Sequence, residues 1–220
     1  TVAMLEREVA EYPTPVPDAI EVREQLAQLA TTGRHTAREQ QWLREIVRAD
    51  AQAGAARTDR TRFLAATAQL QLAQPLRDTF RAIRLVAPLK KSLAAKRRSM
   101  EAALAAYKSA MDYTVAEVTT AATYETAEMY RSQGKDVMDS ERPKNLKKDE
   151  QEQYESLLED QSFPFEEQSI RIHEVNAARA RDGVYDDWVK KSFVALAELK
   201  PGRYGKTEVI HGVTVDIDDG

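Results

Sequence analysis

The sequence predicts an all-α fold built from helical hairpins. Of the 220 residues, 31% are charged and 7% are aromatic, and the chain holds only 8 glycines and 8 prolines. Alanine, glutamate, glutamine, arginine and leucine, which favour helices, are used heavily. Stretches rich in valine, isoleucine and threonine, which a large sheet needs, are few. Apolar residues recur at helical spacing, which indicates about nine or ten helices of about 12–25 residues each.

The N-terminal part is expected to hold a short helical end and a connector. Residues 1–16 would contain the end of a preceding helix and a proline-rich, extended stretch. Pro17 suits the first turn of the next helix, and Asp18 suits its positively polarised N-terminus. Residues 18–30 place apolar side chains roughly on one face, namely Ile20, Val22, Leu26, Leu29 and Ala30.

The next elements form a predicted antiparallel hairpin. Gly33 breaks the first helix, and a second helix carries Trp42, Leu43, Ile46 and Val47. Residues 52–58 form another break. A helix is then predicted over residues 63–72, capped by Thr58 or Asp59.

Prolines set the predicted boundaries in the rest of the chain. A proline in a helical run ends or kinks the helix at the preceding residue. Pro75, Pro88 and Pro164 are therefore each expected to open a helix. For Pro88, with Ala87 as the boundary, a single kinked helix is the alternative. The resulting helices cover residues 75–86, 88–113, 114–134, 146–163, 164–183 and 186–200. The tail, residues 206–220, alternates apolar and polar residues and is expected to be a short strand or a disordered end.

The bulk chemistry excludes several classes. A formal net charge of −4 argues against global attraction to nucleic acid. The absence of cysteine excludes disulfides, cysteine-ligated zinc and thiol catalysis. No apolar run reaches the ~20 residues that cross a bilayer. The chain opens at Thr1, which indicates a trimmed or processed chain, so a signal peptide or lipid anchor is left open.

No motif for catalysis, metal or cofactor binding stands out. His35, His173 and His211 lack a partner at metal-ligand spacing. There is no Gly-x-Ser-x-Gly elbow and no glycine-rich phosphate loop. The sequence therefore predicts a protein that is not an enzyme and has no catalytic residue, metal or cofactor, although loose carboxylates leave a helical active site as a remote alternative.

Charge is unevenly distributed along the chain. Residues 77–98 carry eight bases against the single acid Asp78, whereas residues 149–167 carry eight acids and no base. Two solvated faces that attract each other weakly explain this pattern most simply. The alternative is that one of the two segments steers a partner of opposite charge.

The C-terminal hairpin follows a recognisable order. Gly183 is followed two positions later by Tyr185, then by the pair Ala195 and Leu196 and by Pro201. This order resembles the tetratricopeptide repeat, a helix–turn–helix unit of about 34 residues. Trp188 departs from it, because the family prefers a small alanine there. Weaker matches are the hairpin turning at Gly33 and the group Tyr124, Ala127 and Tyr130, and the middle of the chain shows no clean period.

A narrower resemblance covers the C-terminal part. The stretches "AEVTTAATYETAEMY" and "GVYDDWVKKSFVALAELKPGRYGK" are similar to bacterial tetratricopeptide proteins that occur with TonB–ExbB–ExbD or gliding-motility systems. This resemblance implies a periplasmic or outer-membrane-associated protein; a cytoplasmic location is the alternative. It also implies protein partners of the ExbB, TonB or motility type.

The fold and function expected from these observations are as follows. Residues 17–205 would form a right-handed solenoid of tetratricopeptide-like hairpins with a concave binding surface. The resemblance implies that this surface is lined by Tyr124, Arg131, His173, Asn176 and Arg179. The expected function is a non-catalytic scaffold that binds a partner peptide or helix in a cell-envelope complex. The alternative is a structural module that self-assembles.

Overall fold

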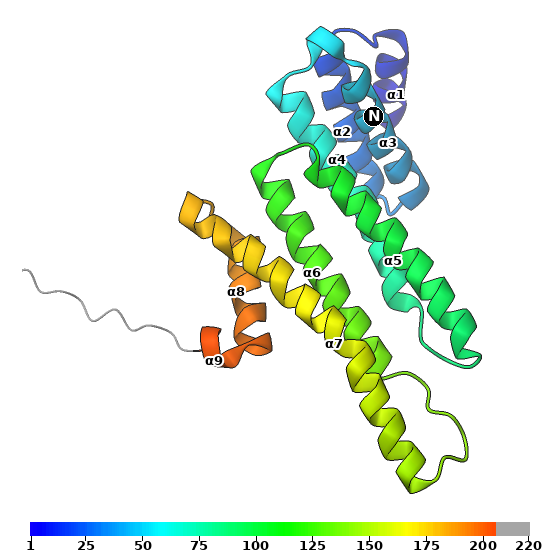
Figure 1. The fold of residues 1–220 in the computed structure, drawn as a ribbon. Helices are drawn as coiled ribbons and strands as arrows, with labels where there is room; N and C mark the ends of the chain where they lie inside the picture. Colours follow the sequence, from blue (N-terminus) through cyan, green and yellow to red (C-terminus); the bar gives the residue numbers. More distant parts are fainter. Residues whose placement is uncertain (206–220) are drawn as a thin grey trace, which may run out of the picture.

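The computed structural model describes residues 1–205, and every element in that range is a helix (Figure 1). The predicted all-α class is confirmed. The predicted tail, residues 206–220, lies outside the described residues, as does His211. The α-helices are α1 Val2–Glu11, α2 Val16–Thr32, α3 Thr36–Gln52, α4 Asp59–Ala82, α5 Leu89–Met111, α6 Ala116–Met138, α7 Lys148–Ala178, α8 Asp187–Leu199 and α9 Pro201–Tyr204. The 3₁₀ turns η1 (Gly54–Ala56) and η2 (Arg179–Asp182) follow α3 and α7.

Helices that follow one another in the chain pack against one another. The most extensive contacts join α6 with α7, α4 with α5 and α2 with α3. Figure 1 shows α1 to α4 gathered at one end of an elongated molecule and the long α7 crossing α6. The helices from α2 to α8 range from 13 to 31 residues, so the units are unequal in size. The right-handed solenoid of repeated hairpins stays a prediction.

Two of the three proline boundaries are wrong. Pro75 lies inside α4 and Pro164 lies inside α7, and both helices continue through them. A proline removes one hydrogen bond to the carbonyl four residues earlier. Here those carbonyls belong to Gln71 and Asp160, which lie at exposed positions where water can satisfy them. The boundary at Pro88 is correct, because α5 begins at the next residue.

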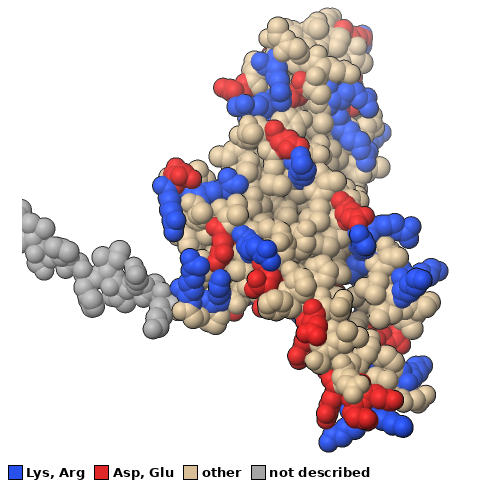
Figure 2. Space-filling view, viewed as in Figure 1, with Lys and Arg blue, Asp and Glu red and all other residues tan. Residues whose placement is uncertain are grey.

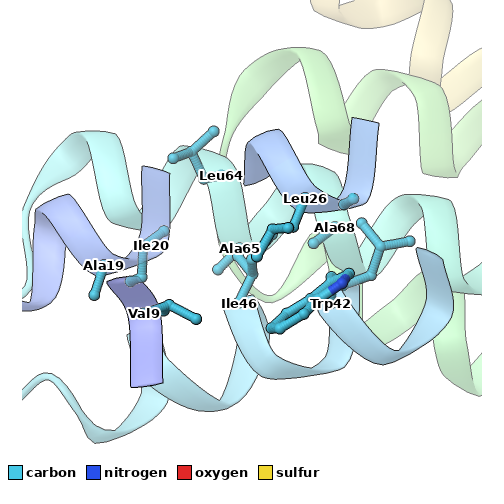
Figure 3. Close-up of a cluster of buried hydrophobic side chains, with 11 residues drawn as sticks. Val9, Ala19, Ile20, Leu26, Trp42, Ile46, Leu64, Ala65 and Ala68 are labelled. Atoms are coloured by element: carbon cyan, nitrogen blue, oxygen red, sulfur yellow. The ribbon is translucent and has the colours of Figure 1, made fainter. Parts of the chain in front are cut away.

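The N-terminal core is a cluster of side chains from α1 to α4 (Figure 3). Val9, Ile20, Leu26, Ile46 and Ala65 lie in it, and Trp42 covers one side. The predicted cap of α4 is present, since the Thr58 hydroxyl accepts a hydrogen bond from the Thr61 backbone N–H.

Lys96 joins the ends of three helices in the middle of the molecule. Its side chain is fully buried, although it carries an ammonium group. Nζ donates to the backbone oxygens of Phe80 at 3.0 Å and Ile83 at 2.8 Å, where α4 ends. It also pairs with the Asp136 carboxylate on α6 at 2.7 Å. A cation placed here satisfies carbonyls that the end of α4 leaves without helical partners.

Candidate functional site

A buried polar network lies where α6, α7 and α8 meet. His173 and Asn176 on α7 and Ser192 on α8 are fully buried. His173 Nδ1 lies 3.3 Å from Ser192 Oγ, and Nε2 lies 3.0 Å from Glu128 Oε1 on α6. The Asn176 amide donates to Ser192 Oγ at 2.9 Å and to the Thr120 carbonyl at 3.1 Å. Three helices are therefore tied together by polar side chains.

The turn before α8 sets the position of Ser192. Gly183 has a φ of 81°, a left-handed conformation that ends η2 and suits glycine. Asp186 then caps α8, because its Oδ1 accepts from the backbone N–H groups of Trp188 at 3.0 Å and Val189 at 2.9 Å. The other carboxylate oxygen of Asp186 accepts from the Thr120 hydroxyl on α6, which fixes the start of α8 against that helix.

Electrostatics favour an ionised Glu128. Burial acts to raise the pKa of Glu128, but the hydrogen bond with His173 and the charge of Arg131 outweigh it and lower the pKa. Arg131 lies 3.7 Å from the Glu128 carboxylate and 2.7 Å from that of Glu198 on α8. A line of alternating charges therefore runs from the network to the surface of α8.

Aromatic rings cover one side of the network. The Tyr124 ring packs in a tilted arrangement against His173 and Trp188, with centroids 5.5 Å apart in both pairs. Lys191 Nζ lies 4.0 Å from the centroid of the Trp188 indole. Burial also raises the pKa of the Tyr124 phenol. Trp188, which departs from the tetratricopeptide pattern, thus covers the polar network.

Serine, histidine and a carboxylate are also the residue types of a nucleophilic triad. In this network, however, Ser192 and His173 are 0% exposed, and Ser192 Oγ already accepts a hydrogen bond from Asn176. A substrate carbonyl has no approach to that oxygen. The arrangement suits a structural role, because its hydrogen bonds join three helices, although Asn176 Oδ1 has no hydrogen-bond partner among residues 1–205.

The structure places the five predicted partner-binding residues in different surroundings. His173 and Asn176 are buried, so their side chains do not line an open groove as expected. Tyr124 and Arg131 lie beside them and are half-buried, and Arg179 is half-buried at the start of η2. Sequence reasoning missed Glu128 and Ser192. No local signal points to Glu128, which is 45 positions from His173.

A groove between α5, α6 and α7 was also missed. It has a volume of about 580 Å³ and is here named the α5–α7 groove. Its lining comprises Leu93, Ala94, Arg97, Met100, Glu101 and Leu104 on α5, Tyr130 and Gln133 on α6, and Phe165 on α7. The signal in the sequence was the spacing of Leu93, Met100 and Leu104, which places all three on one face of a helix.

The two outer helices of the α5–α7 groove differ in charge. Exposed bases on α5 include Lys90, Lys91, Arg97 and Arg98, and exposed acids on α7 include Asp149, Glu150, Glu152, Glu159, Asp160 and Glu166. Each helix also exposes the opposite charge, Glu101 on α5 and Lys148 and Arg171 on α7. Figure 2 shows the acidic side chains gathered towards the lower end of the molecule, over the first part of α7. The charged residues that line the groove, Arg97 and Glu101, both lie on α5 and pair with each other at 3.0 Å.

Among residues 1–205, no three His, Asp or Glu side chains lie close enough together to hold a metal ion. No helix in the described part of the chain is both long enough and apolar enough to cross a membrane. Comparisons with protein-family models, with curated proteins and with solved structures find no match to this chain. The resemblance to tetratricopeptide proteins therefore stays a prediction.

Proposed function

We propose that the chain is a non-catalytic protein-binding scaffold and that its partner binds in the α5–α7 groove. The observation that carries this proposal is the groove itself, which exposes apolar side chains between three helices. Leu93 on its wall is 37% exposed. Apolar grooves with a charged rim are typical of surfaces that bind other proteins.

The lining also disfavours nucleic acid as the occupant. A nucleic-acid groove follows phosphates with bases on both sides and stacks bases on aromatic rings. Here the only charged residues in the lining are Arg97 and Glu101, which pair with each other at 3.0 Å, so no row of bases follows the groove. A protein segment, which offers both charges and an apolar face, suits this groove better.

The cellular setting rests on the resemblance alone. If the chain is a tetratricopeptide protein of the envelope type, its partner is a TonB-, ExbB- or motility-type component. The chain would then work in the periplasm or at the outer membrane. Binding would hold components of a trans-envelope assembly together.

Photo-crosslinking in cells tests the proposal. A photo-crosslinking amino acid replaces Arg97, whose exposed side chain lines the groove, in the full-length protein in its native cells. The matched control carries it at Val194, an exposed position on α8. The proposal expects one defined protein crosslinked from position 97, absent from position 194, and lost when Leu93→Glu is added. Equal products from both positions, or products that survive Leu93→Glu, would contradict it.

Self-assembly is the second candidate, and the charge segregation favours it. The basic segment 77–98 of one copy complements the acidic segment 149–167 of another. Sedimentation over a wide concentration range separates the two candidates. A sedimenting species whose mass increases with protein concentration and that dissociates at high salt favours self-assembly. A monomer at every concentration favours the scaffold.

A further inference from the structure

We propose that a second copy of this chain binds to the first half of α5 with the middle of its own α7, the two helices lying antiparallel. This inference rests on self-assembly, the second candidate for the function. It names the two surfaces that meet, the residues that face one another and the direction of the helices. Leu93 and Arg97 take part and also line the α5–α7 groove, so a second copy bound here competes with any other partner.

The surface on α5 is an exposed leucine between two bases. Leu93 is 37% exposed. Lys90 lies three positions before it and Arg97 lies four positions after it, and both side chains are exposed. Residues three and four positions apart are neighbours on one face of a helix, with Cβ atoms about 5–6 Å apart. The two positive charges therefore lie directly beside the apolar side chain, and these three residues are here named the basic face.

The surface on α7 has the same plan with the opposite charge. Phe163 is 62% exposed. Glu159 lies four positions before it and Glu166 lies three positions after it, and both side chains are exposed. By the same helical spacing, two negative charges flank the exposed ring. These three residues are here named the acidic face, and it complements the basic face in charge while matching it in its apolar centre.

The charges of the two faces remain available for a second copy. Among residues 1–205, Lys90, Glu159 and Glu166 form no ion pair, and Arg97 pairs only with Glu101 on its own helix. That pair uses only Nε of Arg97, at 3.0 Å. A guanidinium group carries five N–H donors, so Arg97 can keep Glu101 and still donate to another carboxylate.

The spacing within each face sets the direction of the two helices. Counted from the apolar residue, the bases lie at positions −3 and +4, whereas the acids lie at positions −4 and +3. Running one helix against the other exchanges these signs. Lys90 of one copy then faces Glu166 of the other. In the same arrangement Arg97 faces Glu159, and the apolar side chains meet between the two ion pairs. In a parallel arrangement each ion pair would be displaced by one residue, about 1.5 Å.

The contact is accessible and small. Figure 1 shows the first halves of α5 and α7 at the end of the molecule opposite to α1. Each face spans seven positions, about 10.5 Å of helix. One apolar pair and two exposed ion pairs give weak binding, and salt screens the ion pairs. We therefore expect association that increases with protein concentration and decreases with added salt.

Disulfide crosslinking tests the register, because the chain has no cysteine of its own. Single-cysteine variants of the whole chain are mixed in pairs under mild oxidation, with a tag on one member so that the mixed dimer is resolved. Lys90→Cys with Glu166→Cys, and Arg97→Cys with Glu159→Cys, should each give a mixed dimer. Lys90→Cys with Glu159→Cys is the control. In the proposed register these two positions are displaced by about 10.5 Å, beyond the reach of a disulfide. The control pair should therefore give about tenfold less mixed dimer. Dimers from the control pair alone overturn the direction, and no dimer from any pair overturns the contact.

Charge reversal tests the chemistry of the contact in sedimentation. Lys90→Glu/Arg97→Glu should raise the dissociation constant of self-association about tenfold or more, and Glu159→Lys/Glu166→Lys should do the same. All four side chains are exposed, so the helix content seen by circular dichroism should not change. A mixture of the two variants should regain the association, because each reversed face then meets a face of opposite charge. A mixture that stays monomeric overturns the inference.

The matched control for charge reversal is Lys91→Glu/Arg98→Glu. These two bases are also exposed, but they lie on another side of α5. This variant should associate like the unsubstituted chain, and an equal loss of association here overturns the named contact. The scaffold function is judged separately from position 97 in cells. If the chain stays monomeric while position 97 crosslinks a different protein, only this inference falls. If position 97 crosslinks only a second copy, this inference stands and the scaffold function falls.

Discussion

We expect the charged side chain of Lys96 to contribute several kcal/mol to the free energy of unfolding, although it is buried. Lys96→Met keeps most of the side-chain volume and removes the ammonium group. The Phe80 and Ile83 carbonyls lose a charged donor, and Asp136 loses the cation 2.7 Å away. The variant thus separates the polar contacts of Lys96 from its packing.

The expected loss follows from these contacts. A hydrogen bond to a charged group contributes about 1.5–3 kcal/mol, and removing one partner of a buried ion pair costs about 3–5 kcal/mol. The Asp136 side chain is 32% exposed, so water partly solvates it once Lys96 is gone. We therefore expect a loss near the lower end, about 3 kcal/mol. For a chain of this size that lowers the melting temperature by about 6–12 °C.

Urea unfolding followed by circular dichroism measures this loss. The midpoint should fall while the dependence on urea concentration stays unchanged. Lys91→Met is the matched control, since Lys91 is exposed on the same helix and should change stability by less than about 0.5 kcal/mol. Adding Asp136→Leu to Lys96→Met should recover part of the loss. If Lys96→Met is as stable as Lys91→Met, the reasoning is refuted.

Three further outcomes are expected. Folding lowers the pKa of Glu128 from its usual 4.5, so its ionised form stabilises the protein above that pH, and this stabilisation disappears as the pH falls through the folded value. Glu128→Gln should therefore lose less stability than the unsubstituted protein as the pH falls below about 5, and parallel curves would contradict this. The Tyr107 hydroxyl is buried beside Arg77 but makes no hydrogen bond of good geometry among residues 1–205, and burial raises its pKa to about 12. Tyr107→Phe should change the free energy of unfolding by less than about 1 kcal/mol, and a loss above about 2 kcal/mol would show that the hydroxyl has a partner. A Cβ added at Gly134 would lie 3.4 Å from Phe165 Cβ, an ordinary contact. Gly134→Ala should therefore raise stability by up to about 1 kcal/mol in urea unfolding, whereas Gly134→Leu should lower it.

Helix positions were readable from the sequence because each helix has an apolar face that repeats with its own turn. The hairpin turning at Gly33 and the start of α5 after Pro88 follow from such local patterns. Pro75 and Pro164 were misread because local preference favours a break there. Packing on both sides of each proline, with Phe80 buried after the first and Ile170 after the second, favours continuation.

The site was less predictable for a physical reason. His173 and Asn176 were expected to line an open binding surface, but they are buried, and their partners Glu128 and Ser192 come from other helices. The α5–α7 groove depends on the angle at which α7 crosses α6 (Figure 1), and no pattern within one helix encodes that angle.

The continuity of α7 through Pro164 makes this helix a single long rod that spans several parts of the molecule. Its 31 residues form a rod about 46 Å long. The rod runs from its acidic N-terminal part, past the groove at Phe165, to the buried polar network around His173. Pro164 removes one backbone hydrogen bond from this rod at the residue next to Phe165, which lines the groove.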